Sequence, residues 1–176
     1  MIQEDTGTQD LLVRLEDKVA VITLNRPEAR NAMSGEMNAA LQKALYEAEL
    51  DPQVGCIVLT GAGKGFCAGG DVKGMASSGD GTVGDNTIDG AIHRQRDNQR
   101  ATAGKLFKMP KPTIASLPGA AAGAGLSLAL ACDLRIMSSK AFMTTAFAKV
   151  GFSGDYGGTY FMTQLIGSAK ARELYF

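Results

Sequence analysis

Two glycine-rich loops, each placed directly after a short apolar run, most constrain how this chain can fold. The first, GKGFCAGGD, covers residues 63–71 and follows CIVLTG. The second, GAAAGAG, covers residues 119–125 and follows TIASLP. Glycine loses more entropy on folding than other residues, but it permits positive φ and lets another group approach the backbone. Both loops are therefore expected to present backbone N–H groups at the ends of buried strands.

The apolar residues around these loops alternate between the spacing of a strand and that of a helix. Strands are expected at 11–16, 18–25, 56–61, 113–119 and 133–138. Helices are expected from Ser34 to about Leu50, from about 87 to 108, and over 126–132. This alternation predicts an α/β fold with the strand ends on one side of the sheet. Residues 1–10 read as a polar tail, and 11–176 as a single domain.

The charge balance and cysteine content exclude several classes of function. Eighteen basic residues balance eighteen acidic ones, so no field attracts nucleic acid or an anionic membrane surface. No apolar run reaches the length of about 18 residues that a membrane span needs. The three cysteines lack CxxC spacing, which predicts neither a disulfide framework nor a metal site. A soluble cytoplasmic protein is expected.

The glycine loops match neither of the two common phosphate-binding motifs. A P-loop requires a glycine five positions before the Gly63-Lys64 pair, where this chain has Val58. The dinucleotide fingerprint GxGxxG requires glycine at its last position. This chain has Phe66 there if the motif starts at Gly61, and Leu128 if it starts at Gly123. Two backbone amides that converge on a developing oxyanion remain as a functional interpretation. Tight turns beneath closely packed helices remain as the alternative.

Four stretches in order resemble the crotonase superfamily, the enoyl-CoA hydratase/isomerase group. They are NRPEARNAM (25–33), GKGFCAGGDVKGM (63–75), KPTIASLPGAAAGAGLSLALACDLRI (111–136) and KVGFSGDYGGTYFMTQLIG (149–167). The resemblance implies a spiral of β-β-α repeats with parallel sheets and outer helices. It also implies an acyl-CoA substrate, no further cofactor, and a homotrimer or dimer of trimers for a full-length chain. Family members continue past Phe176 through helices that pack the trimer, and these are expected to be missing here.

The resemblance also assigns residues by position to the binding of the CoA thioester. The oxyanion hole is expected at the backbone amides of Ala68 and Ala124, where the thioester enolate of this family is stabilised. The residues expected to border CoA or the acyl group are Ala29, Arg30, Lys64, Phe66, Gly69, Gly70, Asp71, Val72, Phe147 and Phe152. For Lys64, an ordinary solvated lysine is the alternative.

The chain departs from the hydratases of this family at the catalytic positions. Two glutamates hold the water in those enzymes, and Ser127 and Phe147 stand in their places. Asp155 occupies the position of a functional aspartate in dienoyl-CoA isomerases and 4-chlorobenzoyl-CoA dehalogenase. We therefore expect Asp155 to transfer protons, with Ser127 orienting water or substrate as a second catalytic residue.

Alternative interpretations of these residues stay open at the level of the sequence. Asp155 as a nucleophile would make the protein an acyl-CoA hydrolase or dehalogenase. Asp155 as the cap of a helix that begins near Gly157 would have no catalytic role. Ser127 as a serine that bonds only to the backbone would also have no catalytic role. A non-catalytic acyl-CoA binder is the third functional class.

Overall fold

The computed structural model describes residues 2–71 and 87–176, and its main element is a six-stranded sheet of order β1-β2-β3-β4-β5-β7. The strands are β1 (Ile2–Glu4), β2 (Leu11–Glu16), β3 (Val19–Leu24), β4 (Cys56–Gly61), β5 (Thr113–Leu117), β6 (Ala121–Ala122), β7 (Leu134–Met137) and β8 (Met143–Thr144). The helices are α1 (Gly35–Leu50), α3 (Ile88–Ala101), α4 (Ala103–Phe107), α5 (Ala124–Ala131) and α6 (Gly158–Tyr175). Two 3-10 turns, η1 (Pro27–Ala29) and η2 (Phe147–Val150), complete the described elements.

The first strands and helix form where the apolar spacing predicts them. Asp17 and Lys18 both adopt positive φ and make the tight turn between β2 and β3, which pair antiparallel. The Ser34 side chain accepts a hydrogen bond from the Met37 backbone N–H at 3.0 Å and so caps α1. One face of α1 is buried against the sheet, through Met37, Ala40, Leu41, Ala44, Leu45 and Ala48.

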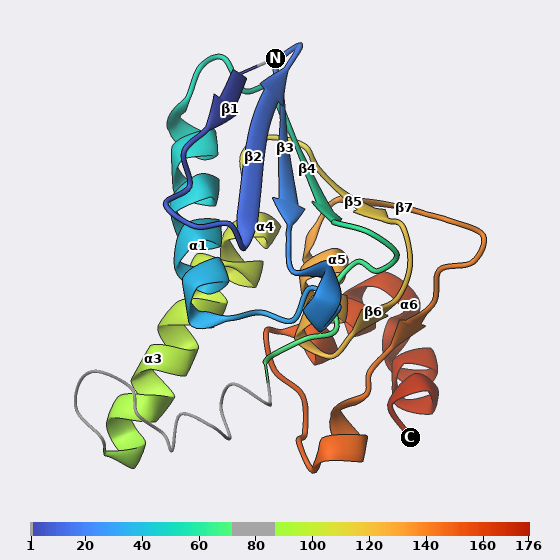
Figure 1. Cartoon of the computed structure of the whole chain (residues 1–176). Helices are drawn as coiled ribbons and strands as arrows, with labels where there is room; N and C mark the ends of the chain where they lie inside the picture. Colours follow the sequence, from blue (N-terminus) through green and yellow to red (C-terminus); the bar gives the residue numbers. More distant parts are fainter. Residues whose placement is uncertain (1, 72–86) are drawn as a thin grey trace.

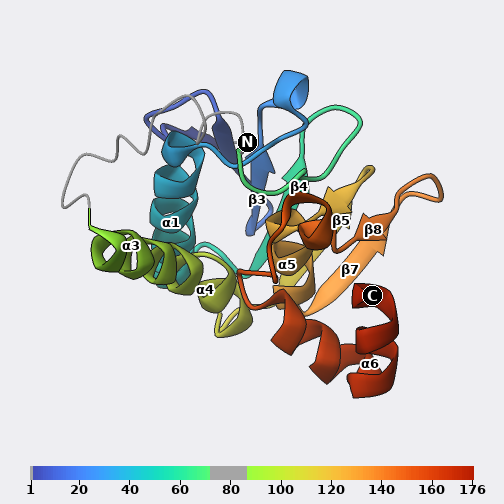
Figure 2. The ribbon, with the colours of Figure 1, turned by 90° about the horizontal axis from the view of Figure 1, so that it is seen from below.

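From β3 onward the sheet is parallel, through β4 and β5 to β7. Figure 1 shows that the strands carry the chain toward the region that holds β6 and α5. Figure 2 shows α1, α4 and α5 beside one another along the sheet, with α6 beyond α5. The α/β fold expected from the sequence is confirmed, and the carboxyl ends of β4 and β5 deliver the two glycine-rich loops to the same end of the sheet.

Two expected elements differ from the structure. The helix expected over 87–108 is broken at Thr102 (φ −114°, ψ −89°), which separates α3 from α4. The Thr102 hydroxyl donates to the Asn98 carbonyl at 2.6 Å, an internal bond that stabilises the break. The segment expected as a polar tail contains β1, which pairs with β2 in antiparallel register.

No helix within residues 2–71 and 87–176 is long and apolar enough to cross a membrane. Over the same ranges, no group of three or more histidine, cysteine, aspartate or glutamate side chains is arranged to hold a metal ion.

Candidate active site

The two glycine-rich loops lie against each other. The backbone N–H of Ala122 donates to the Cys67 carbonyl at 2.9 Å, and the N–H of Phe66 donates to the Ala120 carbonyl at 3.0 Å. The close approach of the two loops requires glycine at position 125, because a Cβ there would lie 2.6 Å from the Cβ of Cys67. The convergence of the two loops expected from the sequence is therefore present.

The two amides assigned to an oxyanion hole differ in their bonding. Ala124 opens α5, where the first backbone N–H groups have no acceptor within the helix. It lies close to the first loop, since a Cβ built on Gly69 would lie 3.3 Å from its nitrogen. The N–H of Ala68, in contrast, donates to the Arg30 carbonyl at 3.0 Å. One of the two expected donors therefore already has an acceptor in this structure.

Asp155 is half-buried, and its two carboxyl oxygens have different surroundings. Oδ2 accepts a hydrogen bond from Gln95 Nε2 at 3.4 Å, whereas Oδ1 is buried and has no partner among the described residues. Burial raises the pKa of the Asp155 carboxyl above its usual value of 3.8. Gly157 is the N-cap of α6, and no side chain caps the helix, so the structure does not support the capping alternative for Asp155.

Ser127 is fully buried on α5 and holds the backbone beside Asp155. Its hydroxyl donates to the Asp155 carbonyl oxygen at 3.0 Å, with the Gly123 carbonyl at 3.4 Å. Both acceptors are backbone carbonyls, which agrees with the alternative that Ser127 bonds only to the backbone. The geometry therefore gives Ser127 a positioning function for the segment that carries Asp155.

The two phenylalanines expected around the acyl group differ in burial. Phe147 is buried, and its ring lies beside Gly123 and Gly154. Phe152 is 55% exposed, so its side chain does not line a closed apolar wall in this structure. Phe66, also expected at the CoA site, is fully buried and belongs to the hydrophobic core. The sequence motif did not distinguish a core phenylalanine from one that faces a ligand.

The remaining described residues expected at the CoA site come from η1, its C-cap and the first glycine loop. Arg30 and Lys64 are exposed, and Ala29 is half-buried at the end of η1. Gly69 is buried and Gly70 half-buried in the first loop. Val72 lies outside the described residues.

Asp71 has an ion-pair partner that the sequence did not reveal. Its carboxylate accepts a hydrogen bond from Arg26 at 2.9 Å, and Arg26 also lies 3.4 Å from Asp10. The arginine is mostly buried between the two acids, so the three residues form a small network. Asp71 is therefore engaged in holding the first loop against the segment after β3.

Asn31 is fully buried and was missed by the sequence analysis. Its Nδ2 donates to the carbonyls of Ala62 and Gly65, each at 2.9 Å, and its Oδ1 accepts from the Arg26 N–H at 2.9 Å. One side chain thereby fixes the 25–31 segment to the first glycine loop. The signal that could have revealed it is a polar residue inside a motif, since a buried amide requires such partners.

The buried thiols take no part in the chemistry of this site. Burial raises the pKa of Cys67 and of Cys132 to about 12 each. A thiol of this pKa is protonated near neutral pH and is a poor nucleophile. In this environment Cys67 is a packing residue of the first glycine loop.

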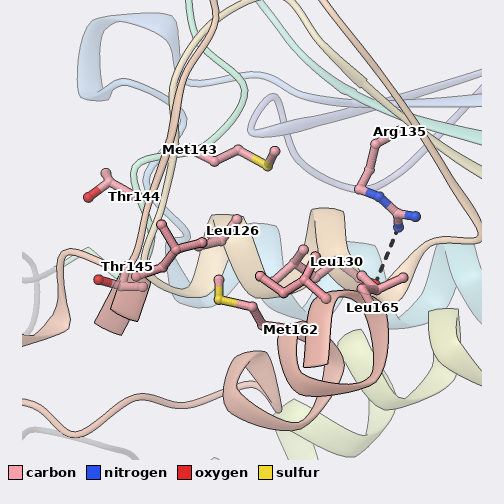
Figure 3. A pocket seen from close by; sticks show the side chains of 10 residues that line it. Leu126, Leu130, Arg135, Met143, Thr144, Thr145, Met162 and Leu165 are labelled. Atoms are coloured by element: carbon pink, nitrogen blue, oxygen red, sulfur yellow. Dashed lines mark hydrogen bonds between the residues drawn. The ribbon is translucent and has the colours of Figure 1, made fainter. Parts of the chain in front are cut away.

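A cavity of about 450 Å³ lies between α5, β8 and α6 and does not include Asp155 (Figure 3). Leu126, Leu130 and Met162 point into it from α5 and α6. Arg135 stands at its rim and approaches the Leu130 carbonyl at 3.5 Å. The largely apolar lining shows that this cavity is separate from the polar groups around Asp155.

Comparison with known protein families identifies the family of this chain. The family described as Enoyl-CoA hydratase/isomerase matches residues 14–176. The chain belongs to this enoyl-CoA hydratase/isomerase family. Its resemblance to the crotonase superfamily, stated from four sequence stretches, is thereby confirmed.

Curated relatives within the family carry both hydratase and isomerase names. "Probable enoyl-CoA hydratase EchA14" of Mycobacterium tuberculosis is 40% identical over 162 residues, which cover 92% of this chain and 60% of that protein. "1,2-epoxyphenylacetyl-CoA isomerase" of Escherichia coli is 38% identical over 164 residues, which cover 93% of this chain and 61% of that protein. The chain thus spans about 60% of the length of these relatives.

Solved structures of the enoyl-CoA hydratase/isomerase family share the fold. A putative enoyl-CoA hydratase from Streptomyces coelicolor superimposes with a TM-score of 0.84 at 34% identity, covering 94% of this chain and 58% of that one. A putative enoyl-CoA hydratase/isomerase from Mycobacterium abscessus gives a TM-score of 0.83 at 31% identity, covering 94% and 62%. The crotonase-type fold expected for this chain is therefore confirmed.

Proposed function

We propose that this chain carries the acyl-CoA site of an enzyme that stabilises a thioester enolate, with Asp155 as the proton-transfer group. The observation that carries the proposal is the buried, unpartnered Oδ1 of Asp155, on a side chain that caps no helix. A carboxyl group whose pKa is raised by burial is suited to exchange protons near neutral pH. The family membership supports a CoA thioester as substrate and requires no resident cofactor.

In the proposed reaction, Asp155 takes a proton from a carbon of the acyl chain. The electrons of that C–H bond form a carbon–carbon double bond, and the thioester oxygen becomes an enolate oxygen. The amides of Ala124 and Ala68 would donate to this oxygen, and Asp155 would return the proton to a different carbon. Because the Ala68 N–H donates to the Arg30 carbonyl here, the substrate oxygen would have to replace that acceptor.

A decisive experiment follows proton exchange in deuterated water. Crotonyl-CoA and a 3-enoyl-CoA are incubated with the protein, and deuterium in the thioesters is measured by mass spectrometry. Asp155→Asn should lower the exchange rate at least about 100-fold, because general acid–base groups contribute about 10²–10⁴-fold, while thioester binding is kept. Asp97→Asn, an exposed acid on α3, is the matched control and should exchange at the rate of the unsubstituted protein.

Three results would contradict the proposal. Full exchange by Asp155→Asn would remove the assigned role. Binding without exchange by the unsubstituted protein would identify a non-catalytic acyl-CoA binder. An aspartyl adduct after a single turnover would make Asp155 a nucleophile instead of a proton-transfer group.

Residues 11–176 form the core domain in this proposal. A homotrimer or dimer of trimers for the longer protein, and a cytoplasmic location, stay predictions from the family resemblance. Light scattering of the purified chain tests the assembly directly.

A further inference from the structure

The end of α6 brings a tyrosine to the neighbourhood of Asp155. Gly167 has non-helical backbone angles (φ 78°, ψ 159°), and α6 changes direction there, as Figure 2 shows. The ring of Tyr175 then stacks on the ring of Phe147, with centroids 6.5 Å apart and an interplanar angle of 2°. Tyr175 is therefore fixed by ring packing, independently of its hydroxyl group.

Two buried polar atoms in this part of the protein have no partner. Among the described residues with buried side-chain nitrogen or oxygen atoms, only Asp155 Oδ1 and the Tyr175 hydroxyl lack a hydrogen bond. Both residues lie beside Gly158, whose backbone N–H donates to the Asp155 carbonyl at 3.1 Å and whose Cα is close to the Tyr175 hydroxyl. Burial and the Asp155 charge raise the pKa of Tyr175. Buried polar atoms are nearly always satisfied, so two orphans in one place indicate a binding partner between them.

The absence of a side chain at Gly158 brings hydroxyl groups close to the backbone beside these atoms. A Cβ on Gly158 would lie 3.1 Å from the Tyr175 hydroxyl oxygen and would overlap the hydroxyl of Ser127. Ser127 in turn donates to the backbone carbonyl of Asp155. The glycine thus allows two hydroxyl groups to stand next to the segment that presents the Asp155 carboxyl.

We propose that the Tyr175 hydroxyl and the Asp155 carboxyl together bind one oxygen atom, carried by the acyl group of the substrate or by the water that adds to it. The tyrosine donates its O–H to that oxygen, and the carboxyl group exchanges a proton with it. This inference rests on the proposed function, because it assigns a second polar group to the same acyl site. Where the acyl group carries the oxygen, Tyr175 distinguishes oxygen-bearing acyl groups from plain ones.

The test combines a variant that lacks the Tyr175 hydroxyl with two ligands that differ by one hydroxyl group. Tyr175→Phe keeps the ring that stacks on Phe147 and loses only the hydroxyl. Tyr160→Phe is the matched control on the same helix, where the tyrosine side chain is 54% exposed and packs on Phe107 and Phe161. Affinities for 3-hydroxybutyryl-CoA and butyryl-CoA are measured by calorimetry, and the hydration of crotonyl-CoA is followed separately.

The two sources of the oxygen give different supporting results. If the acyl group carries it, Tyr175→Phe binds 3-hydroxybutyryl-CoA about tenfold more weakly and butyryl-CoA unchanged. If water carries it, both affinities stay unchanged, and hydration slows about tenfold in kcat with the same KM. If the unsubstituted protein does not hydrate crotonyl-CoA, the two affinities alone test the inference.

Other outcomes overturn the inference. Equal behaviour of Tyr175→Phe and the unsubstituted protein in all measurements would leave the hydroxyl without a role. An equal loss of affinity for both thioesters would show that Tyr175 acts through packing alone. Failure of the unsubstituted protein to bind butyryl-CoA would refute the proposed function itself, and this inference with it.

Discussion

The N-terminal unit from β2 to β4 and the C-terminal segment from β8 to Tyr175 are built in opposite ways. In the first, Ile22, Leu41 and Leu59 are fully buried between regular elements. In the second, residues 145–157 join β8 to α6 with η2 as their one described regular element, and Ala146 and Tyr156 adopt positive φ there. The unpartnered polar atoms of Asp155 and Tyr175 lie in this second segment. Regular packing supplies stability in one region, and an irregular backbone positions polar groups in the other.

The largest effect is expected between the two regions, at Gly125 of α5. A Cβ there would overlap the Cys67 carbonyl oxygen, a backbone atom that cannot rotate away. Gly125→Ala should therefore lower the free energy of unfolding by about 3 kcal/mol or more in a urea titration. Gly65→Ala is the control, because a Cβ at Gly65 meets nothing within 4 Å. Equal stability of the two variants would show that the glycine loops are not tightly packed.

A slightly smaller loss is expected from the core of the N-terminal unit. Leu41→Ala empties a fully buried position on α1 and should cost about 3 kcal/mol, within the range of 2–5 kcal/mol for such truncations. Leu50→Ala removes a side chain that is 61% exposed and should change stability by about 0.5 kcal/mol or less. Matching losses for the two leucines would contradict the assignment of α1 as the buried helix of this unit.

The smallest effect has the opposite sign and comes from the C-terminal segment. Because the folded-state pKa of Asp155 is raised, the folded protein binds this proton more tightly than the unfolded chain does. Stability from this group is complete below the ordinary pKa of 3.8 and is lost as pH rises through the raised value. Asp155→Asn should therefore be more stable than the unsubstituted protein at pH 7, and equally stable at low pH. Thermal melts at several pH values measure this; a destabilised Asn variant at pH 7 would show that the charge is well solvated.

The regular elements could be predicted because their signals are local. Ser34 and the apolar residues that follow it at helical spacing specify α1 within a single stretch of sequence. Asp17 and Lys18 likewise mark the β2–β3 turn between two apolar runs. The break at Thr102 was not predicted, because the sequence before the prolines reads as one continuous helical segment across this residue.

The polar contacts of the site could be predicted only in part, because they join residues far apart in the sequence. Gln95 approaches Asp155 from α3, and Tyr175 arrives only through the change of direction at Gly167. The bond between the Ala68 amide and the Arg30 carbonyl also joins two separate segments. Motif positions identify which residues belong to the site, whereas long-range packing decides which of their atoms are free.

Asn31 also sets a limit on the chemical lifetime of the folded protein. Its amide nitrogen donates to two carbonyl oxygens, of Ala62 and Gly65. Loss of that nitrogen by deamidation would place a carboxylate against both oxygens, with no donor left between them. Asparagine is among the thermolabile residues, so deamidation at this position would turn a donor into an acceptor once heating exposes the side chain. A change of one mass unit at Asn31 would release the first glycine loop while the sheet behind it stays intact.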